Sequence, residues 1–166
     1  MRMWHYRLIP SLPDLQLRGQ LRELVAIMRC WKINGSPNHL LVNNATSSIN
    51  DFYRYWVWYD YQYQRRFGKP FNRDYMLEVH EFCKTFSKFN LDEKSALMSI
   101  DKMYPDWHNK KYLRVCMANL YEKYAFGVGD NKISEYEWNR LSDTYKQITQ
   151  EDYVIWQSKI KISLKM

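Results

Sequence analysis

The clearest hydrophobic pattern in the chain lies between Leu12 and Trp31. Apolar residues recur there at alternating spacings of four and three, at Leu17, Leu21, Leu24, Met28 and Trp31. This spacing is typical of a helix that buries one face. Pro13 suits the first turn of such a helix, and Asp14 suits the positive end of its dipole. We therefore predict a helix from Leu12 to Trp31 whose apolar ridge packs into the core.

The polar positions of this helix are also ordered. Projected at about 100° per residue, three arginines share one flank: Arg18, Arg22 and Arg29. Glu23 falls on the face away from the ridge, with Gly19 and Ala26 as its small neighbours. These neighbours leave the Glu23 carboxylate uncovered, with room for another segment or a substrate. The alternative interpretation is an ordinary Arg–Glu pair on the surface.

The next segment combines a loop with an aromatic helix. Residues 32–46 carry strong turn chemistry, and Ser48 is a plausible helix start. Eight of the twelve residues from 52 to 63 are aromatic. The expected core stripe of this helix consists of Phe52, Trp56, Tyr59 and Tyr63. Tyr53 and Tyr61 are then the better candidates for surface contacts.

Helical periodicity continues to the end of the chain, and no sustained strand alternation is found. Five more helices are expected, over residues 74–89, 92–103, 109–124, 134–146 and 150–159. The sequence thus predicts an all-α fold with an extended N-terminal segment packed against the core. We expect a helical domain over residues 1–124 and an extra helical segment, residues 125–166, packed on it.

Charge and composition favour an anionic partner. The net charge is +7, and the 17% of aromatic residues are interleaved with Lys and Arg. Such a surface both neutralises phosphates and stacks bases, although a Tyr- and Trp-rich core explains many of the aromatics equally well. No segment is long enough to cross a bilayer. The three cysteines lack metal or redox spacing, as expected of a cytoplasmic protein. Together with the charge, this predicts a cytoplasmic protein that binds nucleic acid, and we expect it to be a monomer.

Most familiar catalytic arrangements are missing from the sequence. The four histidines show no zinc-ligand spacing, and no nucleophile elbow is present. The Gly127–Asn131 run lacks the residues of a phosphate or calcium loop. Paired carboxylates such as Asp92 and Glu93 lie at helix starts, where the helix dipole accounts for them. Glu23 differs because it lies mid-helix among arginines, so chemistry and an ordinary Arg–Glu surface pair both stay open for it, and no metal or cofactor is expected.

Two stretches resemble a known family. The opening Met1-Arg2-Met3-Trp4-His5-Tyr6-Arg7-Leu8-Ile9-Pro10 and the helix motif Leu21-Arg22-Glu23-Leu24 are similar to the bacterial branch of the pyrimidine-dimer DNA glycosylases, the family of the phage endonuclease V type. Arg65-Arg66-Phe67-Gly68 and the Tyr104-Pro105 turn resemble the family too. The similarity covers about residues 1–124, and its most specific part is the first thirty residues.

The resemblance implies a metal-free glycosylase and abasic-site lyase acting on double-stranded damaged DNA. Family members attack the sugar carbon with the chain's own α-amine, form a Schiff base and cleave the strand by β-elimination. The amine here is that of Met1, and the family's essential carboxylate corresponds to Glu23. Arg22 matches a phosphate-binding arginine and Arg2 is a second one. Arg18, Arg29 and Lys123 are further expected DNA contacts.

The sequence departs from the family at the nucleophile. The phage member loses its initiator Met and exposes Thr, whereas Met followed by Arg is normally retained. The nucleophile is therefore Met1, or Arg2 if the chain is processed. Ala26 replaces a basic residue of the family, with Arg29 as a substitute further on. Two alternatives stay open: a DNA-binding protein without activity, and a protein-interaction module using Trp138 and Trp156.

Overall fold

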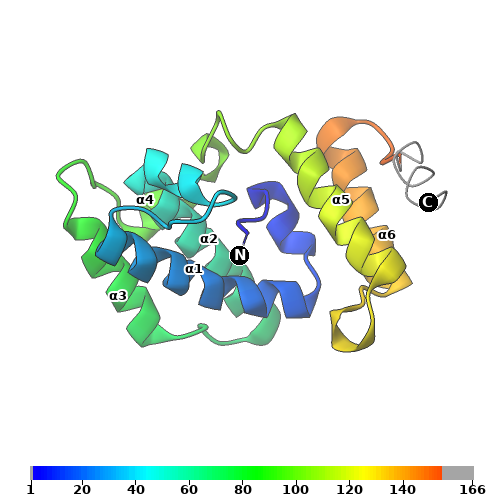
Figure 1. Ribbon diagram of the computed structural model, residues 1–166, viewed down its shortest axis with the longest axis horizontal. Coiled ribbons are helices and arrows are strands. Elements are labelled where there is room, and N and C mark those ends of the chain that lie inside the picture. Colours follow the sequence, from blue (N-terminus) through cyan, green and yellow to red (C-terminus); the bar gives the residue numbers. More distant parts are fainter. Residues whose placement is uncertain (1, 155–166) are drawn as a thin grey trace.

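The computed structural model describes residues 2–154, which fold into helices joined by loops and 3-10 turns, without a strand (Figure 1). This confirms the predicted all-α class. The helices are α1 (Asp14–Asn34), α2 (Ile49–Phe67), α3 (Arg73–Lys84), α4 (Glu93–Leu97), α5 (Lys110–Phe126) and α6 (Glu135–Thr149). The 3-10 helices are η1 (Tyr6–Ser11), η2 (Asn43–Ser47), η3 (Ile100–Lys102) and η4 (Gly129–Asn131). None of the helices within this part of the chain is long and apolar enough to span a membrane.

Helix α1 forms as its pattern predicts. All five residues of the apolar ridge are buried. The helix ends at Gly35, which adopts a left-handed conformation with φ 74° and donates its N–H to the Trp31 carbonyl. This conformation favours glycine, since no Cβ opposes it. The Trp31 ring meets Phe52 of α2 and Phe82 of α3 edge-on, so α1 packs against both helices.

Helix α2 lies at the centre of the fold. Ser48 caps it by accepting a hydrogen bond from the Asp51 N–H, and the four residues of the predicted core stripe are buried. Tyr61 is 39% exposed, as expected. The prediction for Tyr53 was wrong: it is buried and packs edge-on against Phe89, because α3 and α4 cover a further side of α2.

The structure shortens two of the predicted helices. Helix α3 ends at Lys84, and the Thr85 hydroxyl donates to the Phe82 carbonyl at its end. The 92–103 helix is divided into α4 and η3. Ser99 separates the two parts, and its hydroxyl donates to the Ser95 carbonyl at 2.7 Å. Side-chain bonds of this kind compete with the backbone ladder of a helix.

Helix α6 packs against η1 and α5, beside which it runs in Figure 1. It begins at the predicted position, where Ser134 and Glu137 form a capping box. Trp138 is buried and stacks on Tyr124, which leaves little of it for a partner. The helix expected over 150–159 is absent from its described part, because Gln150 is left-handed with φ 60° and residues 151–154 are not helical. Residues 155–159, with Trp156, lie outside the described residues.

The N-terminal segment is extended from residue 2 to His5 and then forms η1. Met3 has no exposed surface. The Tyr55 hydroxyl donates to the Trp4 carbonyl at 2.8 Å, and the Tyr112 hydroxyl donates to the Met3 carbonyl. Figure 1 shows the N-terminus near the middle of the molecule, between the two groups of helices. Tyr55 of α2, which is buried, and Tyr112 of α5, which is half-buried, therefore fix this segment in place.

Candidate active site

The N-terminal segment meets Glu23 directly. The Arg2 backbone N–H donates to Glu23 Oε2, with 3.1 Å between nitrogen and oxygen. Glu23 lies in the middle of α1 and its side chain is half-buried. The structure thus brings together two regions of the sequence that carry the predicted chemistry, the opening segment and the mid-helix carboxylate.

A groove of about 760 Å³ opens at this contact. One wall is the face of α1 that carries Gln16, Gly19, Gln20 and Glu23. The opposite wall is the C-terminal half of α5, with Asn119, Lys123 and Phe126, and the turn after it. Arg2 and Trp4 line the groove as well. The Glu23 carboxylate therefore faces a space large enough for a small ligand or part of a larger one.

Gly19 keeps the groove open beside Glu23. A Cβ built on Gly19 meets no atom within 4 Å, so the space next to this residue is free. Ala26, the other small neighbour of Glu23, is exposed and does not line the groove. The room around Glu23 lies on the side of Gly19.

Two buried histidines hold the N-terminal segment at the groove. His5 Nε2 donates to the His108 carbonyl at 2.7 Å, and the Tyr6 N–H donates to His108 Nδ1 at 3.2 Å. The His5 N–H donates to Cys116 Sγ. Burial lowers the pKa of His5 to about 4 and the pKa of His108 well below its usual value. Both rings are therefore neutral at physiological pH and act as hydrogen-bonding anchors.

No sequence pattern indicates these anchors. Their partners are 102 to 111 positions apart, so no local spacing connects them. The spacing of the histidines bears only on metal binding. Within residues 2–154, no group of three or more His, Cys, Asp or Glu residues is placed to hold a metal.

The predicted DNA-binding arginines have different surroundings. Arg22 is exposed. The Arg18 guanidinium lies 4.3 Å from the centre of the Phe67 ring, and Arg2 lies over Trp4. Arg29 makes two bonds to the Glu78 carboxylate, at 2.9 and 2.7 Å. The charge of Arg29 is thus matched within the protein, whereas the Arg22 side chain is presented to solvent.

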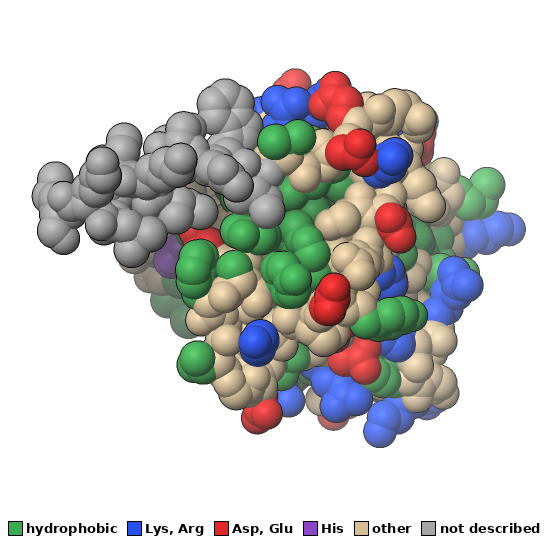
Figure 2. All heavy atoms as spheres, turned by 90° about the vertical axis from the view of Figure 1, so that its right-hand side faces the viewer, with side chains coloured by type: hydrophobic (Ala, Val, Ile, Leu, Met, Phe, Trp, Pro, Cys, Tyr) green, Lys and Arg blue, Asp and Glu red, His purple; other side chains and the backbone are tan. Residues whose placement is uncertain are grey.

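Lys123 lines the groove from the α5 side and is half-buried. After Glu23 and Arg2, Lys123 is the third predicted site residue that lines this groove. Met1, the predicted nucleophile, lies outside the described residues. Figure 2 views the side of the molecule that carries α5 and α6; its Lys and Arg side chains gather toward the lower and right-hand edges, with hydrophobic side chains near the centre.

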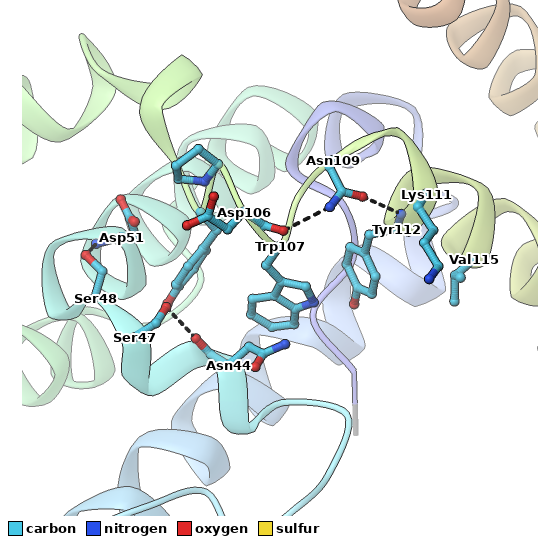
Figure 3. Close-up of a pocket in the computed structure, with 12 residues that line it drawn as sticks. Asn44, Ser47, Ser48, Asp51, Asp106, Trp107, Asn109, Lys111, Tyr112 and Val115 are labelled. Carbon is cyan, nitrogen blue, oxygen red and sulfur yellow. Dashed lines mark hydrogen bonds between the residues drawn. The ribbon is translucent and has the colours of Figure 1, made fainter.

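Helix α5 also lines a second cavity, of about 680 Å³ (Figure 3). Trp107 stands in this cavity between Asn44 and Tyr112. Lys111 and Val115 line it from α5, about two helical turns and one helical turn, respectively, before Asn119 of the groove. The two cavities therefore share α5 as a common wall, and the N-terminal segment passes close to both.

The fold and the groove define a helical protein in which an N-terminal segment meets a mid-helix glutamate at an open cavity. Residues 1–76 match the family model described as pyrimidine dimer DNA glycosylase. No curated protein and no solved structure matches the chain. The predicted family is therefore confirmed over residues 1–76, and it indicates a DNA-repair glycosylase that binds damaged DNA. The resemblance proposed for residues 77–124, and the bacterial branch, stay predictions.

Proposed function

We propose that this protein is a DNA glycosylase and abasic-site lyase that acts on pyrimidine dimers in duplex DNA. The observation that carries this proposal is the 3.1 Å contact between the backbone nitrogen of residue 2 and the Glu23 carboxylate. The backbone one residue after Met1 thus lies next to a carboxylate at the edge of an open groove. The family match over residues 1–76 supports the same reaction class.

The nucleophile of the proposed reaction is the N-terminal α-amine. With Met1 retained, this amine is one residue from the nitrogen that contacts Glu23; with Met1 removed, it is that nitrogen itself. An α-amine has a pKa of about 7.7 to 8.0, so a useful fraction is neutral and nucleophilic near neutral pH. A lysine amine requires burial to reach the same state.

The proposed reaction uses only the amine, acid–base groups and water. The amine nitrogen attacks the sugar carbon C1′ of the damaged nucleotide, and the bond from C1′ to the base breaks. The base departs from its sugar with that electron pair and takes up a proton, and it stays bonded to the neighbouring pyrimidine of the dimer. Loss of the amine proton and opening of the sugar ring give an imine. Removal of a C2′ proton then expels the 3′ phosphate by β-elimination, and water releases the enzyme.

Glu23 is the proposed catalytic carboxylate. It lies next to the amine position and faces the groove where the sugar enters. Its negative charge stabilises the cationic sugar and imine, and its oxygens accept and return protons during imine formation. Gly19 leaves the space that the sugar needs beside the carboxylate.

The proposed phosphate contacts lie in the groove and on the exposed surface of α1. Arg22 and Arg18 are exposed on α1, and Arg2 and Lys123 line the groove. Arg29 can bind a phosphate only when its two hydrogen bonds to the Glu78 carboxylate break. Because phosphate contacts release counterions, binding to duplex DNA is expected to weaken steeply as salt rises.

Borohydride trapping tests the proposal. Reduction of the imine is expected to join the protein covalently to abasic-site duplex DNA, with the adduct on the N-terminal peptide. The Glu23→Gln variant keeps the shape of the side chain and removes its charge, so we expect normal DNA binding with no strand cleavage at the dimers of irradiated duplex. Glu81→Gln, which removes an exposed charge on α3 paired with Lys84, is the matched control and keeps full activity.

Three outcomes contradict parts of this proposal. An adduct on Lys123 keeps the lyase and removes the α-amine as nucleophile. Full turnover in Glu23→Gln reduces that residue to a structural hydrogen-bond partner. DNA binding without any trapped adduct or strand cleavage identifies a DNA-binding protein without activity.

A further inference from the structure

Two glutamines lie on the α1 wall of the groove, and their polar atoms lack partners. Gln16 is 9% exposed and Gln20 is 2% exposed. Gln16 Oε1 and both polar atoms of the Gln20 amide are buried without a hydrogen-bond partner among residues 2–154. Buried polar atoms nearly always have a partner, because leaving one unpaired costs free energy. Three such atoms in one groove wall therefore call for a functional explanation.

These glutamines share a face with Glu23. Gln16, Gln20 and Glu23 follow one another at spacings of four and three, and all three line the groove. One turn of an α-helix rises about 5.4 Å, so Gln20 lies about one turn from the proposed catalytic carboxylate. Gly19, which precedes Glu23 by four residues and also lines the groove, leaves the space beside it open.

The unpaired atoms restrict what the groove binds. The carbonyl oxygens of Gln16 and Gln20 accept hydrogen bonds, so their partner must carry a donor. Within a DNA strand, the phosphates and the esterified deoxyribose offer acceptors only. The bases alone supply N–H donors. A group that pairs with both glutamines is therefore the polar edge of a base.

We propose that Gln20, assisted by Gln16, binds the polar edge of the damaged pyrimidine whose sugar lies at Glu23. This inference rests on the proposed function, because it places the sugar carbon C1′ beside the carboxylate. A thymine ring presents an N–H between two carbonyls, and the Gln20 amide pairs with it by accepting from the N–H and donating to one carbonyl. Dimer formation consumes the ring's carbon–carbon double bond and leaves this edge unchanged.

The polar atoms of Gln20 become available when the side chains lining the groove turn aside. Gln20 lines the cavity even though its amide has almost no accessible surface. Changes of side-chain rotamer at an interface are common on binding. Gln20 is thus a specificity-determining residue: it contacts the base and not the reacting sugar carbon.

The Gln20→Leu variant tests this role on two substrates. Leu keeps the approximate size of the side chain and removes both polar atoms. We expect kcat/KM on irradiated duplex to fall about tenfold, which is the loss typical of one paired base contact. On abasic-site duplex, kcat/KM should change less than about twofold, because that substrate has no base to bind. The thermal midpoint should stay the same or rise, because the variant no longer buries an unpaired amide.

The matched control is Gln62→Leu, which changes a glutamine on α2 that is 7% exposed and lies outside the groove. It should leave the ratio of the two activities unchanged. Gln16→Leu, like Gln20→Leu, should lower the ratio of activity on irradiated duplex to activity on abasic-site duplex. If Gln20→Leu fails to fold, Gln20→Met replaces it in the same test. Equal losses on both substrates, or no loss on irradiated duplex, would overturn the assignment of Gln20. A wild-type protein inactive on both substrates overturns the proposed function and, with it, this inference.

Discussion

The Tyr55→Phe variant examines whether the N-terminal segment must be held in place for chemistry. Tyr55 is fully buried, and its hydroxyl donates to the Trp4 carbonyl at 2.8 Å. The substitution removes this one oxygen and keeps the ring. It leaves the Trp4 carbonyl without that donor, two residues from the nitrogen that contacts Glu23.

The size of the effect follows from burial. Removing one partner of a buried hydrogen bond costs about 1–2 kcal/mol of stability. For a chain of this size, that loss lowers the thermal midpoint by about 3–6 °C. Reacting atoms tolerate little displacement, so we also expect the rate of borohydride trapping on abasic-site duplex to fall about tenfold.

Tyr104→Phe is the matched control. The Tyr104 hydroxyl is also buried and donates to a backbone carbonyl, that of Ala45, at 2.9 Å. Both variants lose the same kind of bond, so both should lose similar stability in urea unfolding. Only Tyr55→Phe should slow trapping. Equal trapping rates in the two variants would refute the argument that anchoring of residues 2–5 sets the position of the amine.

Two further predictions concern stability. Burial lowers the pKa of His5 from 6.5 to about 4, so the unfolded chain takes up a proton on this ring before the folded chain does as pH falls. The contribution of the neutral His5 ring to the free energy of unfolding is therefore complete above pH 6.5. It is reduced by about 2 kcal/mol at pH 5 and is lost toward pH 4. Urea unfolding with the same midpoint at pH 7 and pH 5 would contradict this. Gly19→Ala should raise the free energy of unfolding by about 0.5–1 kcal/mol through helix propensity, because its Cβ meets open space. Gly19→Leu should fold as well but lose turnover on irradiated duplex, and full turnover would show that the sugar does not approach Glu23 from this side.

The elements that depend on local periodicity could be predicted from the sequence. The ridge of α1 and the core stripe of α2 follow from spacings within one helix, and the capping box at Ser134 follows from four consecutive residues. The open space beside Glu23 also follows from its neighbour Gly19 on the same helix. Each of these features depends on residues that are close in sequence.

The features that depend on long-range packing could not be predicted. Tyr53 is buried because α2 is covered on more than one side, and no pattern within α2 shows this. Arg29 is held by Glu78, which is 49 positions away. Gln20 reads as an ordinary polar residue of an amphipathic helix until α5 is placed opposite it across the groove. Its position three residues before Glu23 was the available signal.

The groove joins the matched and unmatched parts of the chain. Arg2 and Glu23 lie within residues 1–76, which match the family model. The groups that hold the N-terminal segment from the other side are His108, Tyr112 and Cys116, all beyond that match. Because the amine is useful only where it meets Glu23, the position of the proposed nucleophile depends on α5 as much as on α1. We therefore expect that a protein truncated after residue 76 keeps the proposed catalytic groups and loses the contacts from His108, Tyr112 and Cys116 that fix the N-terminal segment beside them.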